Sequence, residues 1–538
     1  MRRKVSLLVG VSLLALLVAA PAASARSNGT RSAKAGGLFG SRAQMVRYVR
    51  THGYIPIGGP AAYARYSAAA AQRAAALHPG AYRGPVGTAP VASPSWQGVD
   101  ENDLAPPDPT GAIGTNSYVQ FINDQMAIYS RSGSLIANAG IEALAGGAHL
   151  DYSDPQVIWD PATNRFYYLI LRVANDTFAW GFSKSNNPTS VSPSSFCNYT
   201  ADYGYGSNLP DYPKLGQTKD FLLVGANIYA VEAFLGSDID WITKPQSKKP
   251  LTACPPAASF KQGQVTAIKN ADGTTLASTP EPGVQVDPSS DGWVVALPDS
   301  TNSGATGTEL ELYHVTKNPD GTANIPTTAT AVPVAQYGPP SPAPQSGGAH
   351  TLDTLDGRLI HAVSAIDPAH GSATALWTSH TVFGGAGAEV RWYEIDVANS
   401  KLYQSGAATD ASLFAFNGAL SPDRVVRGSR VHKFGSDMVL GFTTSSAQTA
   451  PAIQMVSKVG SSPQSAFVLV KQSPGPDEGF DCFVLQRCRW GDYSGAAADP
   501  KASTKGTTGK VWLTNMWASG DISPTDATWR TWNWGATP

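Results

Sequence analysis

The side chains best suited to chemistry in this 538-residue chain are carboxylates at the openings of a recurring pattern. Each copy opens on a polar residue or on Asp-Pro, continues with an apolar pair and a turn, and ends in an alternating apolar strand. If the openings converge in the fold, four carboxylates meet an imidazole and a guanidinium. These opening residues are Asp108, Asp154, Asp211, His350, Arg430 and Asp492.

Four carboxylates share one site at neutral pH only with raised pKa values, a bound cation or basic partners. Lys214 and Arg430 are the basic partners that the sequence offers. A Ca²⁺ ion is the alternative, because it prefers oxygen ligands, and its ligands would be Asp154, Asp211 and Asp492. A third reading is structural, since Asp before Pro commonly shapes a turn.

The same residues are of the types that bind or hydrolyse sugars. Glycoside hydrolysis needs two carboxyl groups about 5 Å apart for retention, or about 6.5–9.5 Å apart for inversion. The pairs to measure are Asp154 with Asp211 and Asp211 with Asp492, and Tyr493 is a nucleophile only if an acidic residue activates it. The neighbouring aromatic residues either stack on sugar rings or pack in the core; they are Tyr152, Tyr212, Trp490 and Tyr493.

The elements that must position these residues are short strands. Seven copies begin at Asp108, Asp154, Asp211, Gly283, His350, Arg430 and Asp492. Spread over residues 96–538, each copy has room for a four-stranded sheet with generous loops. One such sheet cannot cover both of its faces, whereas radial packing lets each sheet cover the next. The sequence predicts an all-β fold with a single β-propeller over 96–538. We expect seven blades, with six or eight as alternatives and a β-sandwich as the rival architecture.

The two ends of this region are expected to close the ring. The tail Trp529-Arg-Thr-Trp-Asn-Trp534 resembles a strand that the chain does not continue. We predict that residues near Ser95-Trp-Gln-Gly complete the same sheet. An aromatic ligand platform is the alternative for this tail.

Charge divides the chain in two. Residues 1–95 hold twelve Lys and Arg and no acidic residue, which leaves 27 basic against 40 acidic groups in residues 96–538. An acidic body argues against nucleic acid as a partner.

The first part carries a targeting pattern. Met1-Arg-Arg-Lys4, an apolar run to Ala20 and an Ala-Ser-Ala end predict a secretory signal over 1–25. The apolar run is too short for a typical membrane span. Residues 26–95 read as a basic Ala/Gly/Pro-rich arm and linker, with helical composition at 41–52 and 60–77 and too few apolar residues for a core. The arm is either a tether to anionic surfaces or a loose leader. We expect the protein to be secreted and monomeric, with no transmembrane segment after signal cleavage.

Four cysteines suit an oxidising compartment. Cys482 and Cys488 are separated by five residues and could close a short hairpin, which leaves Cys197 to pair with Cys254. Three connectivities are possible, and this one is favoured.

Familiar catalytic patterns are missing from the sequence. It holds no Gly-x-Ser-x-Gly, His-Glu-x-x-His, phosphate-binding loop or dinucleotide fingerprint. Histidines are scattered without metal-ligand spacing.

Several segments resemble secreted bacterial proteins of the sialidase-like, BNR-repeat propeller family. They are Ser153-Asp-Pro, Asp211-Tyr-Pro-Lys-Leu-Gly, Leu376-Trp-Thr-Ser-His-Thr-Val, Arg391-Trp-Tyr-Glu-Ile-Asp and Arg489-Trp-Gly-Asp-Tyr-Ser. The resemblance implies a propeller and an extracytoplasmic location, but little about chemistry. True sialidases carry Ser-x-Asp-x-Gly-x-Thr-Trp boxes, which this chain lacks. An arginine triad could draw on Arg172, Arg391 and Arg430.

The sequence therefore predicts a secreted propeller that binds an extracellular glycan or protein at one face of its central channel. The alternative is a sialidase-like glycoside hydrolase that uses the converging carboxylates. Besides the opening residues, the predicted ligand contacts are Tyr212, Lys214, Arg391, Trp490 and Tyr493.

Overall fold

The computed structural model describes residues 59–76, 86–148, 151–231, 233–298, 306–427, 430–501 and 508–538, with the backbone alone for 59, 60 and 425–434. These residues form seven sheets of four or five strands, antiparallel except for one short parallel pair in the fifth. The predicted all-β propeller of seven blades is confirmed. The predicted signal at 1–25 and the helical segment at 41–52 lie outside the described residues.

The first three blades follow one another along the chain. Blade 1 contains β2 (Thr110–Ile113), β3 (Ser117–Ile122), β4 (Gln125–Ser130) and β5 (Leu135–Gly140), followed by the short helix α3 (Glu142–Ala145). Blade 2 contains β6 (Tyr152–Asp160), β7 (Arg165–Arg172), β8 (Thr177–Ser183) and β9 (Phe196–Ala201). Blade 3 contains β10 (Leu209–Gln217), β11 (Phe221–Ala230), β12 (Ala233–Thr243) and β13 (Gln262–Val265), with η1 (Ala257–Ser259) before β13.

Blades 4 and 5 each carry a fifth, two-residue strand. Blade 4 contains β14 (Ala277–Pro282), β16 (Gly292–Pro298), β17 (Gly307–Lys317), β18 (Ala323–Asn324) and β19 (Thr330–Tyr337). Blade 5 contains β20 (Leu359–Asp367), β21 (Ala373–Val382), β22 (Glu389–Asp396) and β23 (Lys401–Ala408), with η3 (Pro368–His370) after β20. Its fifth strand, β15 (Val284–Gln285), pairs in parallel with β20.

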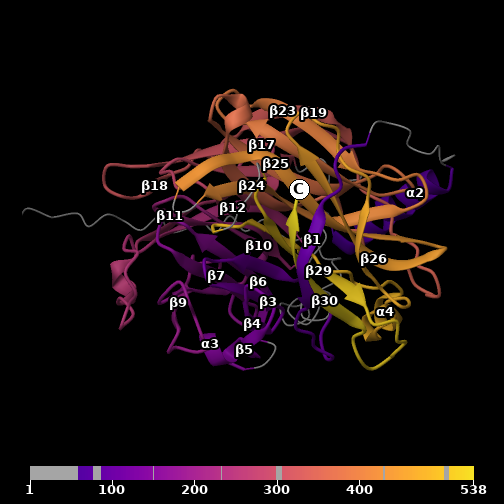
Figure 1. Cartoon of the computed structure of the whole chain (residues 1–538), viewed down its shortest axis with the longest axis horizontal. Helices are drawn as coiled ribbons and strands as arrows, with labels where there is room; N and C mark the ends of the chain where they lie inside the picture. The colour runs from indigo at the N-terminus through magenta and orange to yellow at the C-terminus, as the bar shows by residue number, and fades with distance from the viewer. Residues whose placement is uncertain are drawn as a thin grey trace, which may run out of the picture. The chain divides into compact units, whose positions relative to one another are not determined.

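Blade 7 is built from both ends of the described chain. Blade 6 contains β24 (Phe414–Arg427), β25 (Arg430–Ser446), β26 (Thr449–Val459) and β27 (Val468–Gln472). Blade 7 contains β28 (Gly495–Ala498), β29 (Val511–Ala518), β30 (Trp529–Thr537) and β1 (Val91–Gln97). In it β1 pairs antiparallel with β30, placing Ser95 opposite Trp534 (Figure 1). The predicted closure is confirmed, and Trp534 is core rather than a ligand platform because its side chain is fully buried.

The hydrophobic core lies between neighbouring sheets. One cluster joins blades 2 and 3 through Tyr167, Phe182 and Leu222, and another joins blades 5 and 6 through Trp377, Trp392 and Leu440. Because both faces of most strands are covered, β6, β10 and β11 are buried almost throughout. The innermost strands contact one another in the closed order β2, β6, β10, β14, β20, β24, β28 and back to β2. We call the axis that they surround the hub.

Every blade has a residue of left-handed backbone within four residues of the start of its inner strand. These residues are Asp108, Asp154, Tyr212, Thr279, Leu355, Asn417 and Gly491, with φ between 47° and 63°. In the first four copies a proline follows directly, and at Asp154, Tyr212, Thr279 and Asn417 the strand pairing shifts register. The openings predicted at Gly283, His350 and Arg430 are not the residues with left-handed backbone. In those three blades the left-handed residues near the start of the inner strand are Thr279, Leu355 and Asn417.

The N-terminal arm contributes helix α2 (Gly59–Ala75), close to the helical segment expected at 60–77. Tyr63, Tyr66 and Ala70 fall on one helical face and are buried. The arm was expected to add nothing to a core, but this face packs on the propeller unit. No helix in the described part of the chain is long and apolar enough to cross a membrane.

Two disulfides join the four cysteines as favoured from their spacing. Cys197 pairs with Cys254, and Cys482 pairs with Cys488. The second pair does not close a hairpin, because Cys482 lies in the short helix α4 (Phe480–Leu485).

Candidate functional site at the propeller hub

Side chains from five blades meet in one buried group at the hub. We define the hub cluster as Asp108, Asp154, Tyr212, Lys214, Glu281, Asp492 and Tyr493, all at most 2% exposed. The Asp492 backbone N–H donates to Asp108 Oδ1 at 2.6 Å, and Tyr493 donates to Asp154 Oδ2 at 2.7 Å. Asn123 links the first two blades, because it donates to Asp108 Oδ2 and accepts from the Asp154 N–H.

Burial disfavours the ionised forms of these carboxyl groups. It raises the pKa of Asp108 well above its usual value, and the charges of Asp492 and Asp154 raise it further. Burial also raises the pKa of Asp154, which hydrogen bonds from Ser153 and Tyr493 oppose. For Asp492 burial outweighs the nearby Arg489 and raises the pKa to about 7. The cluster therefore holds protons at a pH where isolated carboxyl groups have none.

Lys214 lies beside a pair of stacked aromatic rings. Its ammonium group is 4.1 Å from the Tyr212 ring centre and 4.0 Å from that of Tyr493, and the two rings stack at 4.9 Å. It also donates to the Ile360 carbonyl at 2.8 Å and lies 3.6 Å from Glu281 Oε2. Burial lowers the Lys214 pKa to about 8 and raises that of Glu281 to about 7.

A second layer of charged groups lies against the hub cluster. We define the arginine layer as Asp353, Asp356, Arg358, Arg487 and Arg489. Arg358 binds Asp356 with two hydrogen bonds of 2.7 Å and stands over the Tyr212 ring at 4.4 Å. Arg489 joins the two layers, because it donates to Asp353 Oδ2 at 2.9 Å and also to Asp492 Oδ1.

Sequence reasoning missed the arginine layer and Glu281. The expected arginine triad is not assembled: Arg172 stands over the Tyr152 ring, and Arg391 binds the Ala335 and Gln336 carbonyls beside blade 4. The Arg430 side chain lies outside the described residues. Glu281 could have been found, because Thr279-Pro-Glu281 repeats the spacing of Tyr212-Pro-Lys214. The arginines gave no such signal, since they stand in loops.

Helix α2 covers the arginine layer. Tyr63 donates from its hydroxyl to Asp353 Oδ1 at 2.6 Å, and the Arg487 guanidinium stands 4.4 Å from the centre of the Tyr63 ring. Burial raises the pKa of Tyr66, and the Asp356 charge raises it further. The order from the hub outward is therefore hub cluster, arginine layer and α2.

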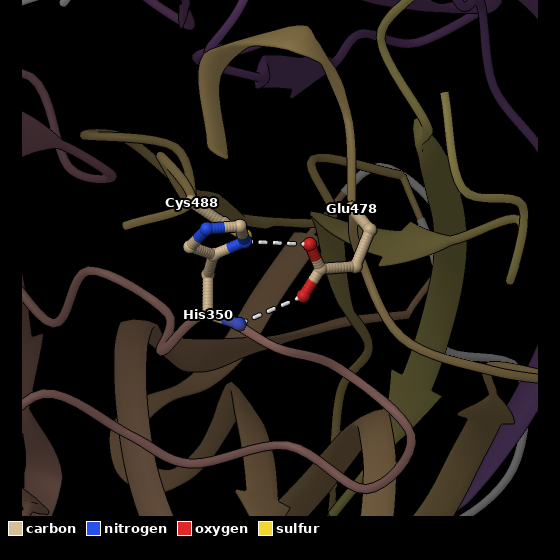
Figure 2. A group of neighbouring side chains, drawn as sticks. All are labelled: His350, Glu478 and Cys488. Atoms are coloured by element: carbon tan, nitrogen blue, oxygen red, sulfur yellow. Dashed lines mark hydrogen bonds and ion pairs between the residues drawn. The ribbon is translucent and has the colours of Figure 1, made fainter. Parts of the chain in front are cut away.

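His350 does not join the hub cluster. Its backbone N–H donates to Glu478 Oε1 at 2.9 Å, and its Nδ1 lies 2.7 Å from Glu478 Oε2. Figure 2 shows this paired contact, with Cys488 beside it. The three residues have metal-ligand spacing, but the Cys488 sulfur is bonded to Cys482 and is not a thiolate.

Two further predicted contacts have other surroundings. Trp490 is buried in the core and donates to Thr443 Oγ1 at 3.0 Å, so its ring is not an exposed stacking surface. Asp211 is buried on β10 opposite Asn227. Among the described residues Asp154, Asp211 and Asp492 are not a group of donors at metal-binding distance, which gives the expected Ca²⁺ site no support.

A small cavity lies further along the inner strands, inside the hub. Its volume is about 40 Å³, and its walls are largely apolar, including Val157, Val363 and Ala496. His361 lines it and bonds the Ala496 carbonyl at 2.8 Å, and burial lowers the His361 pKa to about 4. The cavity has room for a few water molecules and is too small for a sugar ring.

A larger hollow lies away from the hub, between the outer strands of blades 5 and 6. This lateral groove has a volume of about 950 Å³, and Trp392, Lys458, Gln464 and Phe467 line it. Val86 also lines it, where the described chain leads toward β1. Its size falls in the range of ligand pockets.

Some buried polar atoms at the hub have no protein partner. In the part of the chain that the structure describes, no hydrogen bond reaches Asp492 Oδ2 or either polar atom of the Asn417 side chain. Buried polar groups normally find partners, in the protein or in bound molecules. These atoms therefore leave capacity for water or for ligand groups.

The chain matches no protein-family model and no curated protein. Among solved structures, the Dos1 propeller is 10% identical over 83% of this chain and 94% of that one, with a TM-score of 0.37. An endo-arabinase from Bacteroides thetaiotaomicron VPI-5482 is 10% identical over 72% and 93%, with a TM-score of 0.26. A GH43 β-1,3-galactosidase is 10% identical over 59% of this chain and 63% of its own, just under two thirds, with a TM-score of 0.29.

Similarity at these TM-scores assigns no chemistry. No family model places the chain among BNR-repeat or sialidase-like proteins, so that resemblance stays a prediction.

Proposed function

We propose that this chain is an exported β-propeller that binds an extracellular glycan at the hub. The observation that carries the proposal is the hub cluster, where carboxyl, ammonium and phenol groups from five blades meet beside polar atoms that have no hydrogen-bond partner among the described residues. Such groups bind sugar hydroxyls, and stacked tyrosine rings suit the apolar face of a sugar. The signal pattern over 1–25 and the two disulfides support export.

A glycan fits this site better than a protein partner does. A stable protein interface covers about 800 Å² on each partner and needs exposed side chains. The hub cluster is buried under the arginine layer and α2. A sugar at the end of a chain is small enough to enter once the cover moves.

The cover is then a gate whose opening sets the apparent affinity. If only a fraction of molecules is open, the apparent dissociation constant equals the intrinsic constant divided by that fraction. The Tyr63 hydroxyl bond to Asp353 favours the closed state, and Tyr63→Phe removes this bond. Tyr66 provides a matched control, because its buried hydroxyl has no hydrogen-bond partner among the described residues.

We therefore expect Tyr63→Phe to bind glycan about 3–10-fold more tightly than the wild type, since a hydrogen bond contributes about 0.5–1.5 kcal/mol. Tyr66→Phe should match the wild type. Tyr493→Phe, which removes the bond to Asp154, should bind about tenfold more weakly. A glycan array of bacterial polysaccharides and sialylated oligosaccharides, followed by titration of each hit, measures these changes.

Two results would contradict the hub site. The first is a glycan hit whose affinity is unchanged in Tyr493→Phe but lost in Phe467→Ala, which would move binding to the lateral groove. The second is the absence of any hit for Tyr63→Phe as well as for the wild type. Circular dichroism spectra of each variant show whether the fold is retained.

One observation also favours a second function, glycoside hydrolysis. Burial raises the pKa of Asp492 to about 7, so this carboxyl group can give up a proton near neutral pH, as a general acid must. Incubating each bound glycan with the protein tests it. Cleavage by the wild type that Asp492→Asn abolishes with the fold intact would establish an enzyme, whereas binding without cleavage leaves the glycan-binding function alone.

A further inference from the structure

Blade 5 carries a group of ligating side chains at the end of β20 that is remote from the hub cluster. Asp367 ends β20, His370 ends η3 and Glu394 lies on β22. One donor atom from each residue lies within 4.8 Å of the others. We call these three residues the blade 5 triad.

The local fold explains how the triad is assembled. Asp367 caps η3, because its Oδ1 accepts from the Ala369 N–H at 2.7 Å. This cap turns the chain back, so that His370 Nδ1 contacts Asp367 Oδ2. The His370 ring stacks on Tyr403 at 3.7 Å and 10°, which fixes its plane.

Glu394 supplies a second, independent indication of a ligand. Its side chain is fully buried, and Oε2 accepts from Gln404 Nε2 at 2.7 Å. In the described structure Oε1 receives no hydrogen bond, although it has no access to solvent. Burial raises the pKa of Glu394, and the adjacent Asp367 carboxyl group raises it further. Two carboxyl groups therefore face one another, and either a shared proton or a cation must lie between them.

We propose that the blade 5 triad binds a divalent transition-metal ion, with Zn²⁺ as the best fit. Zn²⁺ binds nitrogen and carboxylate oxygen at about 2.0–2.2 Å, so the ligands of a tetrahedral site lie about 3.3–3.6 Å apart. The triad reaches this spacing with small side-chain movements. The ion would replace the protons between the three groups and offset the negative charge of the two buried carboxylates.

The triad leaves one position of a tetrahedral site for water. The two carboxyl groups are buried, but the His370 side chain is 35% exposed, which gives an ion a path from solvent. A nitrogen and two oxygens suit Zn²⁺ or Mn²⁺ better than Ca²⁺, which prefers oxygen alone. The bound ion would tie the turn after β20 to β22.

The test measures metal content in the full chain. The wild type and both variants are stripped with chelator and dialysed against micromolar ZnCl₂. Elemental analysis should then find one more zinc per chain in the wild type than in His370→Ala or Glu394→Gln. In titrations the two variants should bind zinc at least about 100-fold more weakly. Glu394→Gln keeps the shape of the side chain and can donate to Asp367, so it should fold.

His314 provides a matched histidine. It stacks on Trp293 at 4.1 Å and faces Asp291 at 3.4 Å, but within the described residues it is part of no three-donor group. His314→Ala should therefore bind zinc like the wild type. Equal zinc in the wild type and His370→Ala, or equal loss in His314→Ala, would overturn the proposal, as would uptake of CaCl₂ in place of zinc. The melting temperature without metal shows that each variant is folded.

Discussion

Replacing Arg489 by methionine should lower the free energy of unfolding by about 3–5 kcal/mol, because it strips buried carboxylates of a guanidinium. The Arg489 side chain is 2% exposed and bonds both Asp353 and Asp492. Methionine fills part of the volume but donates nothing. Asp353 keeps Arg487 at 3.2 Å, whereas the Asp492 carboxyl group loses the cation that lowers its pKa most and keeps only the weaker effect of Arg358.

Arg530→Met is the matched control in the same blade. Arg530 pairs with Asp100 at 3.0 Å, but Asp100 is 41% exposed, so water replaces the lost partner. Exposed ion pairs contribute about 0–1 kcal/mol, and we expect a loss in that range. Urea denaturation of the three proteins at one pH measures the difference.

A second set of variants tests why Arg489 matters. If the loss comes from an uncompensated charge at Asp492, Asp492→Asn should cost less in the Arg489→Met background than in the wild type. Arg489→Lys should be intermediate, because one ammonium group cannot fork between two carboxylates. Equal losses for Arg489→Met and Arg530→Met would mean that the arginine layer adds nothing to stability.

The sequence could predict part of the candidate site, but it could not predict the arginine layer. Asp108, Asp154 and Asp492 were placed at the hub correctly, because a repeated opening must recur at equivalent positions around a ring. Arg358 and Arg489 were not, since their carboxylate partners follow from how two long loops fold over the hub. No local pattern encodes that contact.

The misplaced repeat openings have a physical cause as well. The equivalent residue in each blade has positive φ, which Asn and Gly adopt readily and which Thr, Leu and Tyr rarely do. The residue types of Thr279 and Leu355 therefore do not indicate a left-handed backbone. The alignment of the repeats followed the apolar pairs after Gly283 and His350 instead. The proline after Asp108, Asp154, Tyr212 and Thr279 is the signal that would have recovered the fourth copy.

Closure and cysteine pairing were predictable for a different reason. A propeller ring leaves one sheet incomplete unless both chain ends contribute, so an aromatic last strand needs a partner near the start. That constraint comes from the ring as a whole, so it can be applied without knowing any individual contact. The hidden position of α2 shows the limit, because nothing in its Ala-rich sequence tells that Tyr63 reaches Asp353.

The pair of Lys214 and Glu281 should give the protein a weak point in stability near pH 7.5. Glu281 has a folded pKa of about 7 against an ordinary 4.5, so the folded state holds a proton that the unfolded state loses between these values. Its contribution is fully present below pH 4.5 and is lost as the pH rises through 7.

Lys214 acts in the opposite direction at higher pH. Its folded pKa is about 8 against 10.5, so the unfolded chain binds more protons between these values and stability rises with pH across this window. Between pH 7 and 8 both groups are charged in a site that disfavours charge, and their separation of 3.6 Å offsets only part of that cost.

The double variant Lys214→Met, Glu281→Gln removes both titrations and retains most of the volume. Relative to this variant, the wild type should be less stable at pH 7.5 than at pH 5 or 9.5 by on the order of 2 kcal/mol, since one pKa unit corresponds to about 1.4 kcal/mol. Urea midpoints of both proteins at the three pH values measure the difference, and other titrating groups cancel in it. A difference that does not vary with pH would show that the pair is already relaxed by water or by a bound ligand at the hub.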